Sequence, residues 1–335
     1  MTDSLLRVGL IGTGRIGQIH GRHIGNHADS VLARIADPYI EGARQLAKGF
    51  GSEVTDDPRE LIDSGDLDAV VVAAPTPQHV NLIEACVDAG VPVLCEKPID
   101  LDLTRVDGLA AKVAASGVPV AIGFNQRFDP AIAEVHERVA NGAIGQLEQL
   151  VLVSRDPGPP PADYLAVSGG IFRDMTIHDF DLARFFVGEV VEVSAFGSAL
   201  FDAGAQQHDD FDTVNVTLRG ASGALVSIVN SRHSAYGYDQ RLEAFGSEGL
   251  LQVANAPASL VHAASAEGVE TKAPYVESFL DRYETAYARE LTEFYRLVRR
   301  EAATSPTFQD GQAAQVIADA AHRSAHERRT VRLDS

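Results

Sequence analysis

The chain has no tryptophan and only two cysteines among its 335 residues. Both cysteines, Cys86 and Cys95, stand in apolar surroundings, in "LIEACVDAG" and "VPVLCEKP". A small thiol in such a setting is most often a buried core residue. Because disulfides are rare in reducing compartments, this scarcity predicts two buried thiols and a cytoplasmic location rather than a disulfide framework.

Basic residues are also scarce: 28 Lys and Arg stand against 47 Asp and Glu, which gives a formal net charge of −19. A surface this acidic repels nucleic-acid phosphates and anionic lipid headgroups. The composition therefore argues against nucleic acids and membrane surfaces as partners. It leaves room for a small anionic cofactor that is held in a local pocket.

Long apolar runs are missing as well. A helix that spans a bilayer needs about 20 apolar residues, whereas the longest run here, "AVVVAAP" at Ala69–Pro75, suits a buried strand. The N-terminal sequence "MTDSLLRVGLIG" enters a short apolar run that Gly12 interrupts. We therefore expect no signal peptide.

The first 120 residues do contain a regular alternation of short apolar runs and helical stretches. Runs such as "RVGLIG", "DAVVVAAP" and "VPVLCE" lack the polar alternation of a half-exposed strand, and stretches such as "PQHVNLIEACVDAG" separate them. Strands that are buried on both faces and joined by helices form a parallel sheet with right-handed crossovers. Residues 1–123 are therefore predicted to form a Rossmann-type, doubly wound α/β domain.

From residue 124 onward the pattern changes. Strand-like runs such as "LEQLVLVSR", "DTVNVTLRG" and "GALVSIVNSR" follow one another with turn signals and little helix between them. This order predicts an α+β domain over residues 124–335 with a large, mostly antiparallel, open sheet. A final helix is expected at about residues 309–328, and packing of this helix back on the first domain is left open.

A glycine motif lies at the end of the first predicted strand. The sequence "VGLIGTGRIGQIH" places Gly12, Gly14 and Gly17 as G-x-G-x-x-G between a strand and a helix. The first glycine allows a tight turn, the second lets the backbone approach a pyrophosphate, and the third lets helix and strand pack closely. Because the N–H groups at the start of the helix then face the phosphates, this loop, with Arg15 and Ile16, is predicted to hold a dinucleotide.

The second predicted strand, "VLARIAD", ends in Asp37, which Pro38 and Tyr39 follow. A carboxylate at this place accepts hydrogen bonds from the ribose hydroxyls of adenosine and repels a 2′-phosphate. No arginine follows directly, so the sequence favours NAD over NADP. The alternative for Asp37 is a turn residue before proline without a ligand.

Glu96 and Lys97 in "VPVLCEKPID" end another predicted core strand. Ligands of open α/β sheets bind outside the carboxyl ends of the strands. Both residues are therefore expected to border the cofactor, with Lys97 close to the reacting atoms. A surface ion pair between these two neighbours is the alternative.

Several segments together resemble a known family. Four segments carry this resemblance: the glycine motif, "PTPQH" at Pro75–His79, "CEKP", and "GGIFRDMTIHDFD" at Gly169–Asp181. The chain resembles the glucose-fructose oxidoreductase and inositol dehydrogenase family over nearly its whole length. The string "SRDPGPPPADYLAVSGGIFRDMTIHDFD" is similar to inositol 2-dehydrogenases in particular. The resemblance implies a catalytic trio, which maps onto Lys97, Asp174 and His178, and it implies no metal.

The chemistry of this trio suits the oxidation of a secondary alcohol to a ketone. Asp174 and His178 are four residues apart, so on one helix they would share a face. A neutral imidazole can accept the hydroxyl proton, and a carboxylate beside it stabilises the resulting imidazolium. A charged Lys97 would stabilise the negative charge that develops on the oxygen.

The segment around His178 has other interpretations. An Asp–His pair on an amphipathic helix is commonly a capping or surface interaction, and an Asp/His/Asp cluster can hold a metal ion. A catalytic zinc needs three protein ligands, so we expect no metal here. Asp179 and Asp181 are assigned to helix orientation or packing.

Four further residues are candidates for binding the ring hydroxyls of a substrate. Arg127 and Arg155 can donate hydrogen bonds, and domain-interface ion pairs are the alternative for both. Tyr236 and Tyr238 are expected to begin a strand, where alternation would point both to one face. The resemblance implies a tyrosine at this place in inositol dehydrogenases, and half-buried sheet tyrosines are the alternative.

Thr76 and His79 follow the fourth predicted strand. The resemblance implies that this loop borders the nicotinamide half of the cofactor. The alternative for His79 is a residue at a helix N-terminus without a ligand.

The sequence therefore predicts an NAD-dependent dehydrogenase that oxidises a ring hydroxyl of inositol to the ketone. One alternative is a sugar or amino-sugar dehydrogenase of the same family that uses NAD or NADP. Another is a dinucleotide-binding sensor without turnover. An open sheet with one uncovered face is commonly covered by a second subunit, and the family suggests a tetramer, so we expect a homo-oligomer, either a tetramer or a dimer.

Overall fold

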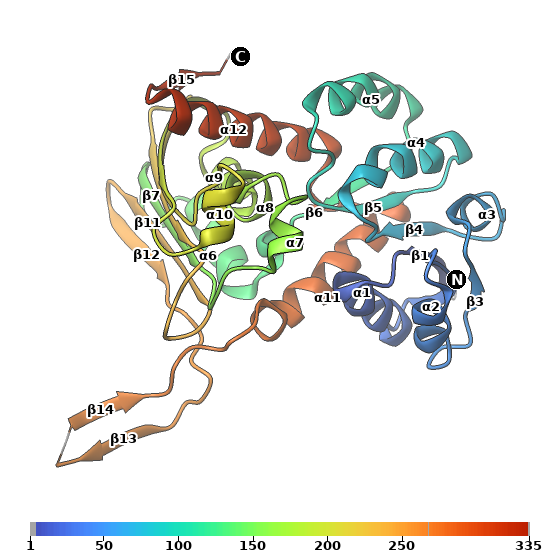
Figure 1. Ribbon diagram of the computed structural model, residues 1–335, viewed down its shortest axis with the longest axis horizontal. Helices are drawn as coiled ribbons and strands as arrows, with labels where there is room; N and C mark the ends of the chain where they lie inside the picture. Colours follow the sequence, from blue (N-terminus) through green and yellow to red (C-terminus); the bar gives the residue numbers. More distant parts are fainter. Residues whose placement is uncertain (1–4, 267, 334–335) are drawn as a thin grey trace. The chain divides into compact units, whose positions relative to one another are not determined.

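The computed structural model of the protein describes residues 5–266 and 268–333. The chain forms two compact units (Figure 1). The first unit contains the residues up to Asn125 together with Ala286–Ala313, and the second contains Gln126–Thr285 together with the residues from Ala314 onward.

The first unit is built on a six-stranded sheet with the order β3-β2-β1-β4-β5-β6. All of its neighbouring strands run parallel. The chain moves outward from β1 to β3 and then returns to the other side of β1, which is the doubly wound arrangement that the sequence predicts. The strands are β1 (Leu6–Ile11), β2 (Ser30–Ala36), β3 (Glu53–Thr55), β4 (Ala69–Val72), β5 (Val93–Glu96) and β6 (Val120–Gly123).

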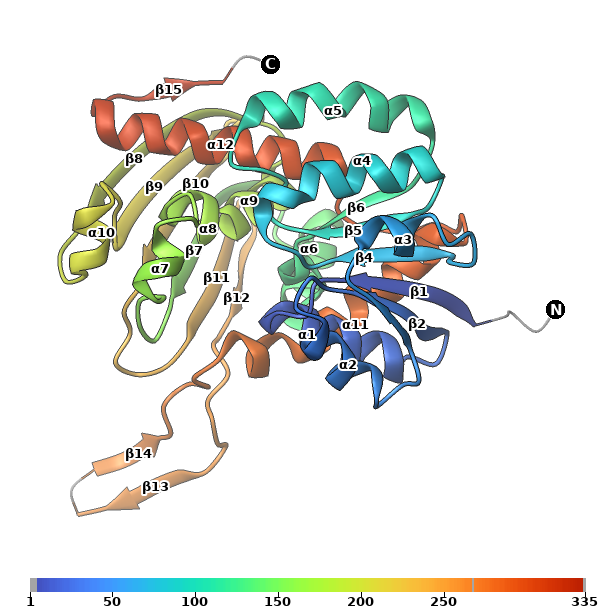
Figure 2. The same ribbon diagram turned by 45° about the vertical axis from the view of Figure 1, so that its right-hand side comes forward.

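Helices cover both faces of this sheet, with α1 and α2 on one side and α4 and α5 on the other (Figure 2). Local signals set several of their ends: the side chains of Asp57 and Asp102 cap α3 and α5, and left-handed Gly90 and Gly117 end α4 and α5. The helices are α1 (Arg15–Asn26), α2 (Ile40–Ala47), α3 (Pro58–Ile62), α4 (His79–Ala89) and α5 (Leu103–Ser116), with a 3-10 turn η1 (Thr76–Gln78) before α4.

The second unit contains a seven-stranded sheet with the order β12-β11-β7-β10-β9-β8-β15. Only β7 and β10 pair in parallel, and the other neighbours are antiparallel, so the predicted mostly antiparallel sheet is confirmed. The strands are β7 (Leu147–Arg155), β8 (Val190–Ser198), β9 (Thr213–Gly220), β10 (Leu225–Ser231), β11 (Asp239–Gly246), β12 (Gly249–Val253) and β15 (Val331–Arg332).

The two faces of the seven-stranded sheet differ in burial. Along β9, β10 and β11 nearly every second side chain is buried, as expected for strands with one face on a core. Helices pack on the buried face, and α9 contacts β7 while α6 contacts β11 and β12. The helical segments before β9 are η2 (Asn125–Phe128), α6 (Pro130–Ala140), α7 (Ala162–Leu165), α8 (Ile171–Asp174), α9 (Ile177–Val187) and α10 (Ala203–Gln207).

The last third of the chain adds a hairpin and two long helices. The hairpin of β13 (His262–Ser265) and β14 (Gly268–Lys272) projects away from the seven-stranded sheet (Figure 1). The predicted final helix is present as α12 (Phe308–Glu327), whereas α11 (Phe279–Val298) is not among the elements expected from the sequence. None of the helices in the described residues is both long enough and apolar enough to cross a membrane.

Candidate active site

The glycine loop joins β1 to α1, and the structure gives each glycine a different reason to be glycine. Gly12 has φ +96°, and a Cβ there would lie 2.5 Å from the carbonyl oxygen of Ala73. A Cβ on Gly17 would lie 2.0 Å from the carbonyl oxygen of Gly12, whereas a Cβ on Gly14 would meet nothing within 4 Å. The fold itself requires the first and third glycines, and the second leaves the open space that a pyrophosphate would need.

The start of α1 suits an anion. The helix begins at Arg15, and no side chain of the described residues caps its N-terminus. The first N–H groups of a helix have no partner within the helix, and the helix dipole favours negative charge beside them. The loop therefore fits the phosphates of a dinucleotide.

Asp37 lies directly after β2 and beside the glycine loop. Its Oδ2 accepts hydrogen bonds from the backbone N–H and the hydroxyl of Thr13, at 2.6 and 2.7 Å, and its Oδ1 accepts one from the N–H of Tyr39 at 2.7 Å. These three donors hold the carboxylate in one orientation at the loop. Thr13 is not among the residues expected at the site, although its place between two motif glycines is the signal that marks it.

The loops after β4 and β5 are tied together by His79. Its ring nitrogens lie 2.8 Å from the carbonyl oxygen of Pro98 and 2.7 Å from that of Ala74, and the side chain is 1% exposed. Burial lowers the pKa of His79. The hydrogen bonds to the backbone raise this pKa, but by less than burial lowers it. These contacts support the structural alternative for His79, while Thr76 begins the turn η1 just before it.

Glu96 ends β5, and Lys97 follows it at the carboxyl edge of the sheet. Since β1, β4 and β5 are adjacent and parallel, this edge also carries the glycine loop. Glu96 Oε1 lies 2.8 Å from Nε2 of the fully buried His20 on α1. Lys97 is partly buried, at the edge where the ligand crevice is expected.

In the second unit, the expectation that one helix carries Asp174 and His178 is wrong. Asp174 is the last residue of α8, His178 is the second residue of α9, and a turn at Met175 and Thr176 separates the two helices. The spacing of four residues therefore does not by itself set their geometry. Asp174 is held by other side chains: Oδ1 accepts from the hydroxyl of Tyr164 at 2.7 Å, and Oδ2 accepts from Nη1 of Arg232 at 3.0 Å.

Asp179 anchors α9 to the sheet, next in sequence to His178. It is 2% exposed, and it accepts hydrogen bonds from the hydroxyl of Ser154 on β7 at 2.7 Å and from the amide of Asn230 on β10 at 2.9 Å. Burial raises the pKa of Asp179 to about 7, against the lowering effect of these two hydrogen bonds. Asp179 thus orients the helix, in the role assigned to it from the sequence.

Arg127 and Asp181 form a buried ion pair within the second unit. The guanidinium donates from Nε at 2.7 Å and from Nη2 at 2.5 Å to the two carboxylate oxygens, and it lies over the ring of Phe185 at 4.9 Å. Removing one partner of such a pair leaves a buried charge and costs about 3–5 kcal/mol. For Arg127 these contacts support the ion-pair alternative, although the pair lies inside one unit rather than at a domain interface.

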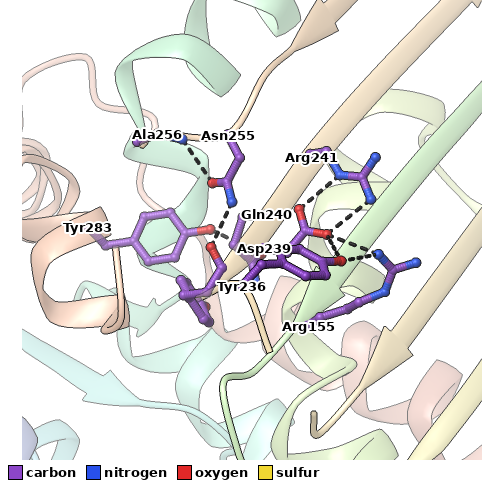
Figure 3. Close-up of polar contacts among 9 residues, drawn as sticks. Arg155, Tyr236, Asp239, Gln240, Arg241, Asn255, Ala256 and Tyr283 are labelled. Atoms are coloured by element: carbon purple, nitrogen blue, oxygen red, sulfur yellow. Dashed lines mark hydrogen bonds and ion pairs between the residues drawn. The ribbon is translucent and has the colours of Figure 1, made fainter. Parts of the chain in front are cut away.

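Arg155 and Tyr236 meet around Asp239 (Figure 3). The side chain of Asp239 is 1% exposed. Arg155 Nη1 donates to the hydroxyl of Tyr236 at 2.7 Å and to Asp239 at 3.0 Å, and Arg241 adds two hydrogen bonds to the same carboxylate. The preceding residue, Ser154, faces α9, and successive strand residues point to opposite faces. The cluster around Asp239 is therefore separate from the contacts that hold α9.

Tyr238 does not share the surroundings of Tyr236, so the expectation of one common face is wrong. Both residues precede β11, and Gly237 between them has φ +105°, which interrupts the alternation of a strand. Tyr236 is 44% exposed, whereas Tyr238 is 7% exposed and packs edge-on against the ring of Tyr283.

The predicted site residues are thus divided between the two units. The first unit gathers the glycine loop, Asp37, Thr76, His79, Glu96 and Lys97 along one sheet edge. The second unit contains Asp174 and His178, and it contains Arg155 with Tyr236 as a separate cluster. No three His, Cys, Asp or Glu side chains in residues 5–266 and 268–333 gather as a metal site would require.

Comparison with known proteins covers both units. A model of an oxidoreductase family with an NAD-binding Rossmann fold matches residues 6–124, and a model of the GFO/IDH/MocA C-terminal domain matches residues 132–252. The chain is 42% identical to the inositol 2-dehydrogenase of Rhizobium meliloti (strain 1021) over 330 residues, which is 98% of this chain and 99% of that protein.

Two solved structures are similar over nearly their whole length. A myo-inositol dehydrogenase from Corynebacterium glutamicum ATCC 13032 is 49% identical, with a TM-score of 0.96 and 99% of each chain covered. The scyllo-inositol dehydrogenase from Lactobacillus casei, with bound cofactor NAD(H) and scyllo-inositol, is 26% identical, with a TM-score of 0.89 and 98% and 99% of the two chains covered. In sequence and in fold, this chain belongs to the GFO/IDH/MocA family of oxidoreductases.

Proposed function

We propose that this protein is an NAD-dependent inositol 2-dehydrogenase, which oxidises a ring hydroxyl of myo-inositol or a close isomer to the ketone. The observation that carries the proposal is the similarity over nearly the full length, at 42% identity to an inositol 2-dehydrogenase and 49% to a myo-inositol dehydrogenase. The open, uncapped glycine loop and the carboxylate of Asp37 add the features that a dinucleotide needs.

In the proposed mechanism, three side chains act on the alcohol. Bound NAD supplies the hydride acceptor. His178 accepts the hydroxyl proton, and Asp174 stabilises the imidazolium that forms. Lys97 stabilises the negative charge on the oxygen as the proton leaves.

The proposed division of labour follows the chain. Residues 1–123 are the proposed NAD-binding part, and residues 124–335 are the part proposed to bind the substrate and form subunit contacts. Ala286–Ala313 are the exception, because they belong to the first unit and support the NAD-binding part. Within the second part, Arg127, Arg155, Tyr236 and Tyr238 are the proposed wall of the substrate pocket. Tyr236 and Arg155 have exposed surface to offer a polyol, although in this structure both are bonded to Asp239 in a cluster apart from the contacts that hold α9. Arg127 and Tyr238 are buried and would act by shaping the wall.

A panel of substrates tests the proposed function. The purified protein is mixed with NAD and, in turn, with myo-inositol, scyllo-inositol, other inositol isomers, glucose and amino sugars, and NADH is followed by absorbance at saturating cofactor. We expect turnover with at least one inositol to exceed that with every sugar. Faster turnover of a sugar would identify the related sugar dehydrogenase instead, and cofactor binding with no turnover of any compound would identify a sensor.

Cofactor preference tests the role of Asp37. The carboxylate repels the 2′-phosphate of NADP, and we expect NAD to bind at least tenfold more tightly. An Asp37→Ser variant removes that charge, so the ratio of the two dissociation constants should fall toward one. An Asp57→Ser variant, which removes a carboxylate at the start of α3 where serine can still cap the helix, should keep the wild-type ratio. Tighter binding of NADP by the wild-type protein would contradict this prediction.

The uncovered sheet face supports the proposal of a homo-oligomer, either a tetramer or a dimer. Phe196 on β8, Phe245 on β11 and Leu250 on β12 are 71%, 42% and 46% exposed. Apolar side chains on one open face commonly mark a subunit contact. A monomer in sedimentation velocity would contradict the proposed oligomer.

The free, buried thiols Cys86 and Cys95 support the proposal of a cytoplasmic enzyme. Inositol breakdown is its proposed setting.

A further inference from the structure

We propose that Arg232 is a positioning residue that holds Asp174 in its working orientation, an inference that rests on the proposed function. Arg232 follows the end of β10 and lies 58 residues from Asp174 in the sequence. Its side chain is 1% exposed, and Nη1 donates a hydrogen bond of 3.0 Å to Oδ2 of Asp174. A guanidinium this deeply buried needs a partner of opposite charge.

The second partner of Arg232 is Asp210. Nη2 of Arg232 lies 3.9 Å from Oδ2 of Asp210, and Oδ1 of Asp210 accepts a hydrogen bond of 2.9 Å from the backbone N–H of Ile171. Gly170 makes this approach possible, because its φ is +84° and a Cβ there would lie 2.9 Å from Oδ1 of Asp210. A chain of contacts therefore runs from Arg232 through Asp210 to the first residue of α8.

The helix α8 needs such support because it is only four residues long. A single turn of helix is unstable by itself, since its few hydrogen bonds do not offset the ordering of the backbone. Arg232 holds Asp174 at the last residue of α8, and Asp210 holds Ile171 at the first. The two contacts fix both ends of the turn that presents the proposed partner of His178.

Arg232 also sets the direction of the carboxylate. Tyr164 donates to Oδ1 of Asp174 and Arg232 donates to Oδ2, so neither oxygen can turn without losing a hydrogen bond. A displacement of about 1 Å at a reacting group can lower the rate about 10²-fold. Without Arg232, Asp174 should therefore fail to stabilise the imidazolium while substrate and cofactor still bind.

Kinetics of two variants test the inference. In Arg232→Ala we expect kcat for the best inositol to fall about 10²-fold, with KM and the dissociation constant of NAD within about threefold of wild type. Guanidinium chloride at low millimolar concentration should restore part of kcat, whereas sodium chloride should not. Arg232→Lys keeps the positive charge and should lose less kcat than Arg232→Ala. It is also the variant to use if the alanine variant does not fold.

The control is Arg138→Ala. Arg138 lies on α6, is 54% exposed and makes an ion pair of 3.4 Å with Glu134, so its loss should leave kcat unchanged. Wild-type kcat in both Arg232 variants would overturn the inference. The inference would also be overturned if guanidinium did not restore kcat in Arg232→Ala and if Arg232→Lys lost as much kcat as Arg232→Ala. That result would indicate a general structural defect.

A readout without turnover separates this inference from the proposed function. The amides of Asp174, Met175 and Thr176 are hydrogen-bonded to the carbonyls of Gly170 and Ile171. In Arg232→Ala and Arg232→Lys, hydrogen exchange of a peptide over residues 171–176 should accelerate at least tenfold, with β9 unchanged. A wild-type protein inactive on every inositol refutes the proposed function, whereas unchanged exchange in both variants refutes the role of Arg232.

Discussion

Replacing His178 with alanine is expected to lower kcat by about 10²–10⁴-fold, the range that a positioned general base contributes. The alanine side chain cannot accept the hydroxyl proton, and the imidazolium that Asp174 would stabilise no longer forms. The dissociation constant of NAD should stay at the wild-type value, because the glycine loop and Asp37 are untouched. Steady-state kinetics with the best inositol, together with NAD titration, measure both quantities.

The matched control for this variant is His262→Ala. His262 lies on the exposed hairpin strand β13, and its loss should change neither kcat nor the affinity for NAD. If His178→Ala keeps its turnover within threefold of wild type, another group takes the proton. His178 would then have to be removed from the mechanism.

Replacing Lys97 with methionine is expected to lower kcat by about 10²–10³-fold, the cost of losing one preorganised donor at a developing oxyanion. Methionine keeps a side chain of similar length and loses the charge. Lys97→Arg keeps the positive charge but places it on a planar guanidinium with different geometry. Its kcat should therefore lie between the kcat of the wild type and that of Lys97→Met. Stopped-flow measurement of NADH formation separates the chemical step from product release.

Lys48→Met is the control for charge removal in the same unit. Lys48 is exposed after the end of α2, and its replacement should leave kcat unchanged. Equal losses of kcat in the Lys48 and Lys97 variants would point to net charge rather than to a contact with the substrate. A Lys97→Met variant that loses only NAD affinity would assign Lys97 to the cofactor alone.

Much of the fold could be predicted because its signals are local. The strands of the first sheet are apolar runs that are buried on both faces, and the four residues of β4 are all buried. The glycine loop is equally local, since Gly17 packs against the carbonyl of Gly12 only five residues before it. The succession of strand-like runs with little helix between them predicted a second, mostly antiparallel sheet, which is present. Along its strands β9 and β10 nearly every second side chain is buried.

The geometry around Asp174 could not be predicted from spacing. An aspartate and a histidine four positions apart suggest one helix, but the chain turns at Met175 and Thr176. Asp174 instead takes its orientation from Tyr164 and from Arg232, which is 58 residues away. No periodicity connects such partners, because their meeting depends on the path of the whole sheet.

The tyrosines show the same limit at shorter range. Alternation predicted that Tyr236 and Tyr238 would share a face, and one glycine with positive φ was enough to prevent it. Gly237 takes that conformation where the chain passes close to Tyr275, since a Cβ on Gly237 would lie 2.5 Å from the carbonyl oxygen of Tyr275. Contact with a distant segment therefore determined a local conformation.

The sequence by itself determined the class of fold, the place of the dinucleotide loop and the membership of a family, because each depends on residues that are neighbours in the chain or on similarity along its length. Only the tertiary structure decided which side chains hold Asp174, which carboxylate Arg155 and Tyr236 share, and that Arg127 is paired with Asp181. Those pairings depend on close packing between distant segments, and a charged side chain becomes committed to a partner only when burial removes water as the alternative.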